Sequence, residues 1–117
     1  MKKRALVILV ALALILAIPA NAAQGRTANV IPGLSFSGTT ATCTVLVSGD
    51  YSTDEIFLVV ELWQESSVVD TWNEEGEGYI NFSETAKVSK DKSYTLKVYP
   101  VINGQELSMA SITKTCS

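Results

Sequence analysis

The amino-acid sequence predicts an all-β domain, a sandwich of about seven antiparallel strands. Three observations carry this prediction. Apolar stretches of strand length alternate with polar residues, turn-forming residues recur about every ten positions, and no helical period occurs after residue 22. Regularly spaced short strands of this kind are typical of sandwiches and barrels. We therefore expect one core enclosed between two sheets.

The longest apolar run beyond the N-terminal segment, residues 56–64, predicts a central strand over 56–65. It is rich in β-branched and aromatic residues and has the length of one strand. Successive side chains of a strand point to opposite faces. The uncharged face, predicted to enter the core, carries Ile56, Leu58, Val60 and Leu62. The opposite, mixed face carries Phe57, Val59, Glu61, Trp63 and Glu65.

The remaining strands are predicted from alternation between turn signals. A short edge strand is expected over 34–37, followed by strands over 41–47 and 68–72 and an interrupted strand over 79–82 and 85–88. The last two strands are expected over 94–102 and 106–116. The predicted inward residues of these strands are Ala41, Cys43, Val45, Val47, Ile80, Phe82, Leu96 and Val98. The charged, glycine-rich segment 73–78 is predicted to be a loop.

Two local signals predict how the strand over 94–102 ends and where its pairing is disturbed. Asn103-Gly104 follows it and favours a type I′ hairpin turn, because both residues tolerate positive φ angles. Pro100 lies inside the strand and cannot donate a ladder hydrogen bond, so we expect a bulge or an early end to pairing there.

The first 22 residues predict a cleaved signal peptide. Lys2-Lys3-Arg4 is a basic segment, residues 5–18 are continuously apolar, and Ala20-Asn21-Ala22 supplies the small residues of a cleavage site. The apolar segment is shorter than the roughly 20 residues of a membrane span. The expected organisation is a signal peptide over 1–22, a flexible lead-in over 23–33 and one domain over 34–117. The protein is therefore expected to be secreted and extracellular, or periplasmic in a bacterium with two membranes.

The charge of the exported chain argues against anionic partners. Loss of the leader would leave six basic and twelve acidic residues, a net charge of −6. Such a charge opposes phosphate backbones and anionic membrane surfaces. We therefore expect no nucleic-acid partner and no membrane association after cleavage.

Two cysteines, Cys43 and Cys116, remain in a chain bound for an oxidising compartment, which favours one disulfide. It would close a loop of 72 residues and stabilise the fold by about 4 kcal/mol. If successive strands alternate in direction, both cysteines lie at the same end of the sandwich, as a bond requires. The alternative is two free or intermolecular thiols.

Residues 94–104 resemble the end of a fibronectin type III or related immunoglobulin-like domain. Tyr94 opens the strand, alternating apolar residues follow, and Asn103-Gly104 leads into the last strand. The whole chain after residue 22 is also similar to small secreted bacterial sandwiches of uncharacterised function. The resemblance implies an immunoglobulin-like sandwich and no particular activity. The chain departs from the family in its cysteine pair and in lacking a tryptophan over 43–47.

No pattern in the sequence indicates catalysis or a cofactor. Histidine is absent, as are the glycine-rich phosphate loop and the Gly-x-Ser-x-Gly elbow. Glu74, Glu75 and Glu77 could hold calcium or serve a small hydrolase, but their spacing fits no ligand motif and favours a solvated turn. We therefore predict a protein that is not an enzyme and has no metal site, catalytic residue or cofactor.

The mixed face of the central strand is the candidate binding surface. Phe57 and Trp63 are expected to share it with Tyr99, and Trp72 is expected nearby. An uncovered aromatic patch of this kind marks a partner or sugar surface. The alternative is that loops cover it or that cross-strand pairs merely stabilise the sheet. The leading hypothesis is a domain that binds an extracellular protein or self-associates, and the second is a carbohydrate-binding module using a tryptophan or tyrosine platform.

Overall fold

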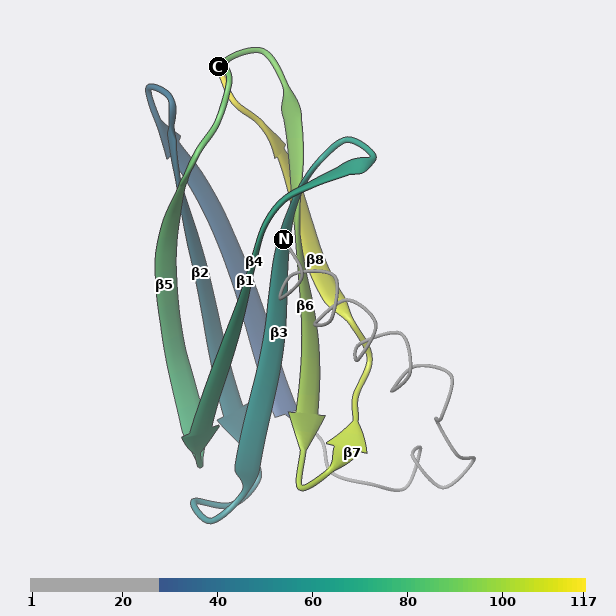
Figure 1. Ribbon diagram of the computed structural model, residues 1–117. Coiled ribbons are helices and arrows are strands. Elements are labelled where there is room, and N and C mark those ends of the chain that lie inside the picture. Colours follow the sequence, from purple (N-terminus) through teal and green to yellow (C-terminus); the bar gives the residue numbers. More distant parts are fainter. Residues whose placement is uncertain (1–27) are drawn as a thin grey trace.

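The computed structural model describes residues 28–117, and this part of the chain is all-β (Figure 1). No helix occurs within these residues, so none there is long and apolar enough to cross a membrane. The predicted signal peptide, 1–22, and positions 23–27 of the predicted lead-in lie outside the described residues. The strands are β1 (Ala28–Ser37), β2 (Thr40–Gly49), β3 (Glu55–Gln64), β4 (Ser67–Glu77), β5 (Tyr79–Lys87), β6 (Ser93–Ile102), β7 (Gln105–Glu106) and β8 (Ala110–Thr115).

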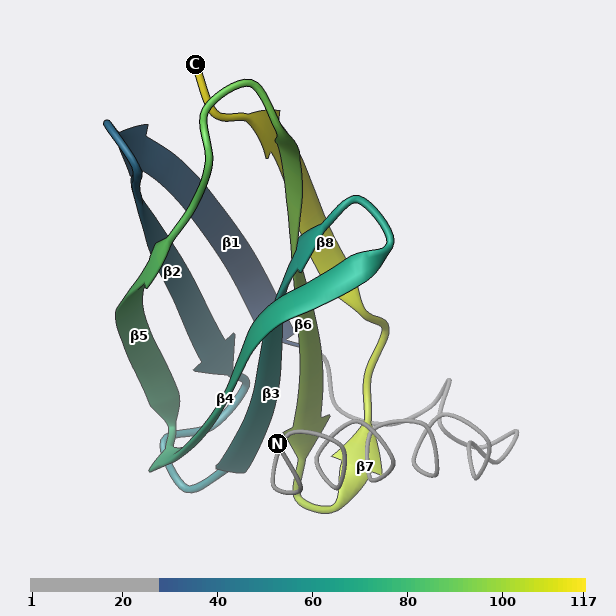
Figure 2. The ribbon, with the colours of Figure 1, turned by 45° about the horizontal axis from the view of Figure 1, so that its top comes forward.

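The strands form two antiparallel sheets that face each other (Figures 1 and 2). One sheet has the order β1-β2-β5, and the other has the order β4-β3-β6-β7, with β8 also paired to β6. Apolar side chains from both sheets form one core between them. The predicted inward residues of β2, β3, β5 and β6 are all buried in it, as the period of two requires. The prediction of an all-β fold is confirmed.

The first strand begins earlier than the sequence predicts. Residues 28–33, expected in the flexible lead-in, pair with β2, and Ala28 lies opposite Gly49. Pro32 is tolerated because β1 is an edge strand, paired only with β2. Gly33 lies close to Thr44 of β2, and a Cβ at this position would meet the Thr44 hydroxyl, which would have to rotate away. Residues 28–33, which the sequence predicts as part of a flexible lead-in, therefore form an extended edge strand.

The charged segment 73–78 is a second correction. Residues 73–77 are not a loop but continue β4, with Glu75 opposite Phe57 and Glu77 opposite Glu55. Only Gly78 turns the chain, with φ +80°, and a Cβ there would approach the Ser52 carbonyl oxygen to 2.8 Å. Charged residues occupy this strand because one edge of β4 is unpaired. The predicted interruption of the next strand is also absent, since β5 is continuous.

Pro100 lies where β6 changes partners. Pairing of β6 with β3 continues past it without a register shift, and Pro100 lies opposite Leu58. On the other side of β6, β8 pairs with it as far as Val98, and the pairing with β7 starts at Val101. The Pro100 carbonyl accepts a hydrogen bond from the Leu107 N–H on this second side. The backbone N and O atoms of one strand residue point to the same side of the strand. The position at which Pro100 lacks an N–H therefore faces the break between β7 and β8.

The turn after β6 has the predicted geometry. Asn103 and Gly104 have φ angles of +52° and +78°, which the type I′ turn requires. The Asn103 side chain also fixes the neighbouring loop, because its Oδ1 accepts from the Glu55 N–H at 2.9 Å and its Nδ2 donates to Asp54 Oδ1 at 3.0 Å. The strand predicted over 106–116 is divided into β7 and β8.

Candidate functional site

Three of the four predicted binding residues share the outer face of the β4-β3-β6 sheet. Phe57 and Trp63 are on β3, and Tyr99 lies opposite Val59 on β6. Their side chains are half-buried rather than exposed. The structure therefore assembles an aromatic face, which we define as Phe57, Trp63 and Tyr99, but it does not leave the rings fully open to solvent.

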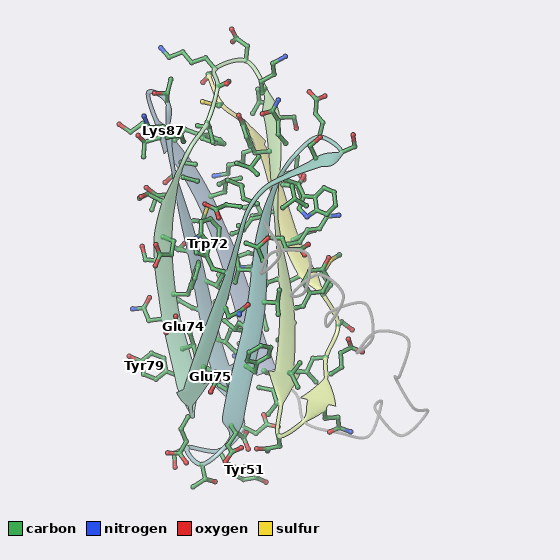
Figure 3. The ribbon with its side chains drawn as sticks, in the orientation of Figure 1. Tyr51, Trp72, Glu74, Glu75, Tyr79 and Lys87 are labelled. Carbon is green, nitrogen blue, oxygen red and sulfur yellow. The ribbon has the colours of Figure 1, made fainter. Side chains whose placement is uncertain are left out.

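Trp72 does not join the aromatic face. It lies opposite Val60 in the β3–β4 ladder, and Val60 points into the core. The Trp72 ring packs edge-on against Phe82 of the other sheet, with ring centroids 5.7 Å apart. Figure 3 shows it between β4 and β5. Trp72 therefore packs against the core, and the expectation that it lies near the aromatic face is wrong.

A buried carboxylate, Glu61, connects two members of the aromatic face, Trp63 and Tyr99. Its side chain is only 2 % exposed. Trp63 Nε1 donates a hydrogen bond to Glu61 Oε1 at 3.0 Å, and the Tyr99 hydroxyl also bonds to Glu61. Burial, followed by the charge and hydrogen bond of Glu61, raises the pKa of Tyr99 to about 12. Period-two alternation places Glu61 on this face, but it gives no sign that Glu61 is buried.

Trp63 has a second intramolecular contact. Lys97, opposite Glu61 on β6, places Nζ 4.1 Å from the centroid of the Trp63 ring. This cation–π contact uses one ring face while Glu61 uses the indole N–H. Less of the Trp63 surface is therefore free to stack on a flat ligand such as a sugar ring.

A groove of about 800 Å³ continues the aromatic face toward one end of the molecule. Phe57 and Val101, opposite each other on β3 and β6, form its apolar floor. The described residues that line it are Glu55, Ile56, Phe57, Glu75, Gly76, Glu77, Val101 and Gly104. Figure 3 shows Glu75 toward this end of β4. The sequence does not predict the groove, because the composition of residues 73–78 favours a loop rather than a strand beside Phe57.

The acidic residues of β4 do not converge on one point. Glu74 lies opposite Leu58, which points inward, whereas Glu75 lies opposite Phe57 on the outer face. Within residues 28–117, no group of three histidine, cysteine or acidic side chains could hold a metal ion. The idea that Glu74, Glu75 and Glu77 together hold calcium therefore receives no geometric support.

The predicted disulfide is not formed in the structure, where Cys43 and Cys116 are both buried free thiols. Cys116 Sγ lies 3.4 Å from the Gly38 carbonyl oxygen, at the β1–β2 turn. Cys43 is in the fourth position of β2, past that turn, about 10 Å along the strand from its first residue. Burial, with a smaller effect of the Asp70 charge, raises the pKa of Cys43 to about 12. Both cysteines lie in the same half of the sandwich, and the bond stays a prediction.

No protein-family model matches the chain, and no curated protein matches its sequence. Among solved structures, it is similar to a superoxide reductase (neelaredoxin) from Ignicoccus hospitalis, with a TM-score of 0.51, 14% identity, and coverage of 85% of this chain and 88% of that one. It is also similar to the sensor domain of the anti-sigma factor RsgI4 from Pseudobacteroides cellulosolvens, with a TM-score of 0.48, 14% identity, and coverage of 80% and 92%.

The comparison with the superoxide reductase corrects one prediction. We expected from the sequence that the protein is not an enzyme, yet a chain of similar fold is one. At 14% identity the likeness shows the fold alone. Missing motifs therefore do not exclude catalysis for this architecture, and function has to be argued from the surface of this chain.

Proposed function

We propose that this chain is an exported immunoglobulin-like domain that binds an extracellular protein through the outer face of the β4-β3-β6 sheet. The observation that carries the proposal is the joint position of Phe57, Trp63 and Tyr99 on one sheet face, continuous with an open groove. Aromatic side chains that combine apolar area with a polar group are enriched in protein interfaces. The predicted leader, residues 1–22, supports export.

The strand order supports the immunoglobulin-like part of the proposal. Constant-type immunoglobulin domains place their first, second, fourth and fifth strands in one sheet and their third, sixth and seventh in the other, so the fourth strand is the one that differs here. Here β1, β2 and β5 form one sheet, and β3, β6 and β8 belong to the other, with β7 a two-residue addition. The fourth strand, β4, joins β3 at the edge of the larger sheet.

A protein is a better candidate than a glycan because of the contacts of Trp63. A sugar platform needs an open ring face, whereas Lys97 covers one face of Trp63 and Glu61 uses its N–H. A protein surface can instead contact the groove floor and the ring edges together. A glycan array tests the alternative, because strong specific binding there would favour the carbohydrate-binding module.

The test compares partner capture by purified variants in the native extracellular fluid. The double variant Trp63→Ser/Tyr99→Ser should lose the captured partner. The matched control is Ile31→Ser/Leu46→Ser, which changes two exposed residues (58 % and 44 %) that lie opposite each other on β1 and β2. Thermal melting confirms that both variants are folded. Equal capture by all three proteins would refute the proposal.

A further inference from the structure

We infer that the groove at the end of the aromatic face takes a basic segment of the partner protein, with lysine or arginine side chains laid across Phe57. The inference rests on the proposed function and assigns part of its surface a ligand chemistry. Three carboxylates, Glu55, Glu75 and Glu77, line the groove together with the apolar side chains of Phe57 and Val101. Among residues 28–117, no lysine or arginine lines it.

The acidic side chains at the groove lack a neutralising partner within the described part of the chain. Glu55 and Glu77 lie directly opposite each other in the β3–β4 ladder, and both are exposed. Like charges in this arrangement destabilise a sheet. Glu106, opposite Val101 on β7, adds a buried carboxylate oxygen with no hydrogen-bond partner among the described residues, and burial raises its pKa. A cationic ligand would relieve the repulsion between Glu55 and Glu77.

The basic residues of the described chain lie elsewhere. Lys87 lies opposite Thr40 and Lys114 opposite Tyr94, both at the far end of their ladders, and Lys90 and Lys92 are in the adjoining β5–β6 connection. The fifth, Lys97, contacts Trp63. Figure 3 shows Lys87 and Glu75 toward opposite ends of the sandwich. Residues 28–117 therefore present an acidic end, which would steer a basic partner into the groove.

The shape of the site selects a side chain rather than a metal ion. The three carboxylates come from two neighbouring strands, β3 and β4, and none of the described acidic groups forms a metal cluster. A lysine or arginine side chain has an apolar stem and a charged end. Its stem can cover Phe57 and Val101 while its charged group reaches Glu75 or Glu77 on the neighbouring strand. Arginine adds paired hydrogen bonds to a carboxylate.

The experiment is an NMR titration of the purified protein with a synthetic octapeptide of alternating arginine and leucine. The control peptide replaces each arginine with uncharged citrulline, and spermidine tests whether a free amine suffices. We expect the arginine peptide alone to shift the backbone signals of Phe57, Val101 and Gly104 in a saturable way. The binding should weaken when the salt concentration rises from 0.1 to 1 M, because the screening length falls from about 10 to about 3 Å.

Three variants locate the interaction. Glu75→Gln and Glu77→Gln should each weaken binding of the arginine peptide by about two- to fivefold, the size of one exposed ion pair. The matched control, Glu84→Gln, changes an exposed acid on β5 in the other sheet and should leave binding unchanged. Equal binding of the citrulline peptide, equal weakening by Glu84→Gln, or binding of spermidine without the peptide would each overturn the inference.

The outcomes also separate this inference from the proposed function. If Trp63→Ser/Tyr99→Ser loses the natural partner but Glu75→Gln and Glu77→Gln leave peptide binding unaltered, the aromatic face stands and the basic ligand is wrong. If the groove binds the arginine peptide but the aromatic variants capture the natural partner normally, the proposed function fails at the aromatic face.

Discussion

Neighbouring residues of β3 should respond very differently to truncation. Leu58 is fully buried between the sheets, so Leu58→Ala removes apolar contacts and leaves a cavity. The expected loss of unfolding free energy is about 3 kcal/mol, within the range measured for buried leucines. Phe57, one residue earlier, is half-buried on the outer face. Although Phe57→Ala removes a larger side chain, it should cost only about 1 kcal/mol, because solvent already reaches the ring.

Urea unfolding followed by circular dichroism measures both values. Each variant should lower the midpoint without changing the slope against urea, since the surface exposed on unfolding is nearly unchanged. For a domain of this size, Leu58→Ala should lower Tm by at least 12 °C, at about 4–8 °C per kcal/mol. If Phe57→Ala destabilised the protein as much as Leu58→Ala, the assignment of the two faces of β3 would be refuted.

Three further predictions concern single groups. The pKa of Tyr99 rises from 10.0 to about 12 on folding, so its contribution to the free energy of unfolding is complete below pH 10 and is lost as the pH rises to 12. Between these pH values the free energy of unfolding should fall by about 1 kcal/mol after allowance for partial exposure, and Tyr99→Phe should abolish that fall. In thermal melts, Gly78→Ala should lower the free energy of unfolding by about 2 kcal/mol and Gly104→Ala by about 1 kcal/mol, because both glycines have positive φ but only a Cβ at Gly78 would also approach the backbone of Ser52. Equal losses would contradict the close approach of Gly78 to Ser52. If Cys43 and Cys116 are bonded, the intact mass of the secreted protein should be lower than that of its reduced form by the mass of two hydrogens. In the reduced protein, Cys43 should react with iodoacetamide at pH 8 only on unfolding, because burial raises its pKa to about 12. Fast labelling of Cys43 in the folded protein would contradict its burial.

Alternation and turn chemistry suffice to predict the parts of the fold that depend on neighbouring residues. The inward face of β3 follows from period two, because one side of a central strand must be apolar. The turn at Asn103-Gly104 follows from the φ angles that these residues tolerate. Both predictions need only a few consecutive residues.

The errors arise where tertiary position overrides local preference. Pro32-Gly33 and 73–77 have turn-like or loop-like composition, but both lie on edge strands, where charge, proline and glycine are tolerated. The position of Trp72 depends on the pairing of β3 with β4, which shifts register between Leu62 and Trp63. A bulge of this kind leaves no clear sequence signal. The groove beside Phe57 could not be predicted without that pairing.

The most direct test of the aromatic face is site-specific photo-crosslinking in the native extracellular fluid. A benzophenone amino acid would replace Phe57 in one preparation and exposed Leu46, on β2 of the other sheet, in a second. We predict one discrete protein adduct from position 57 and none from position 46. An adduct from position 46 alone, or no adduct from position 57 in a folded protein, would contradict binding through the outer face of the β4-β3-β6 sheet.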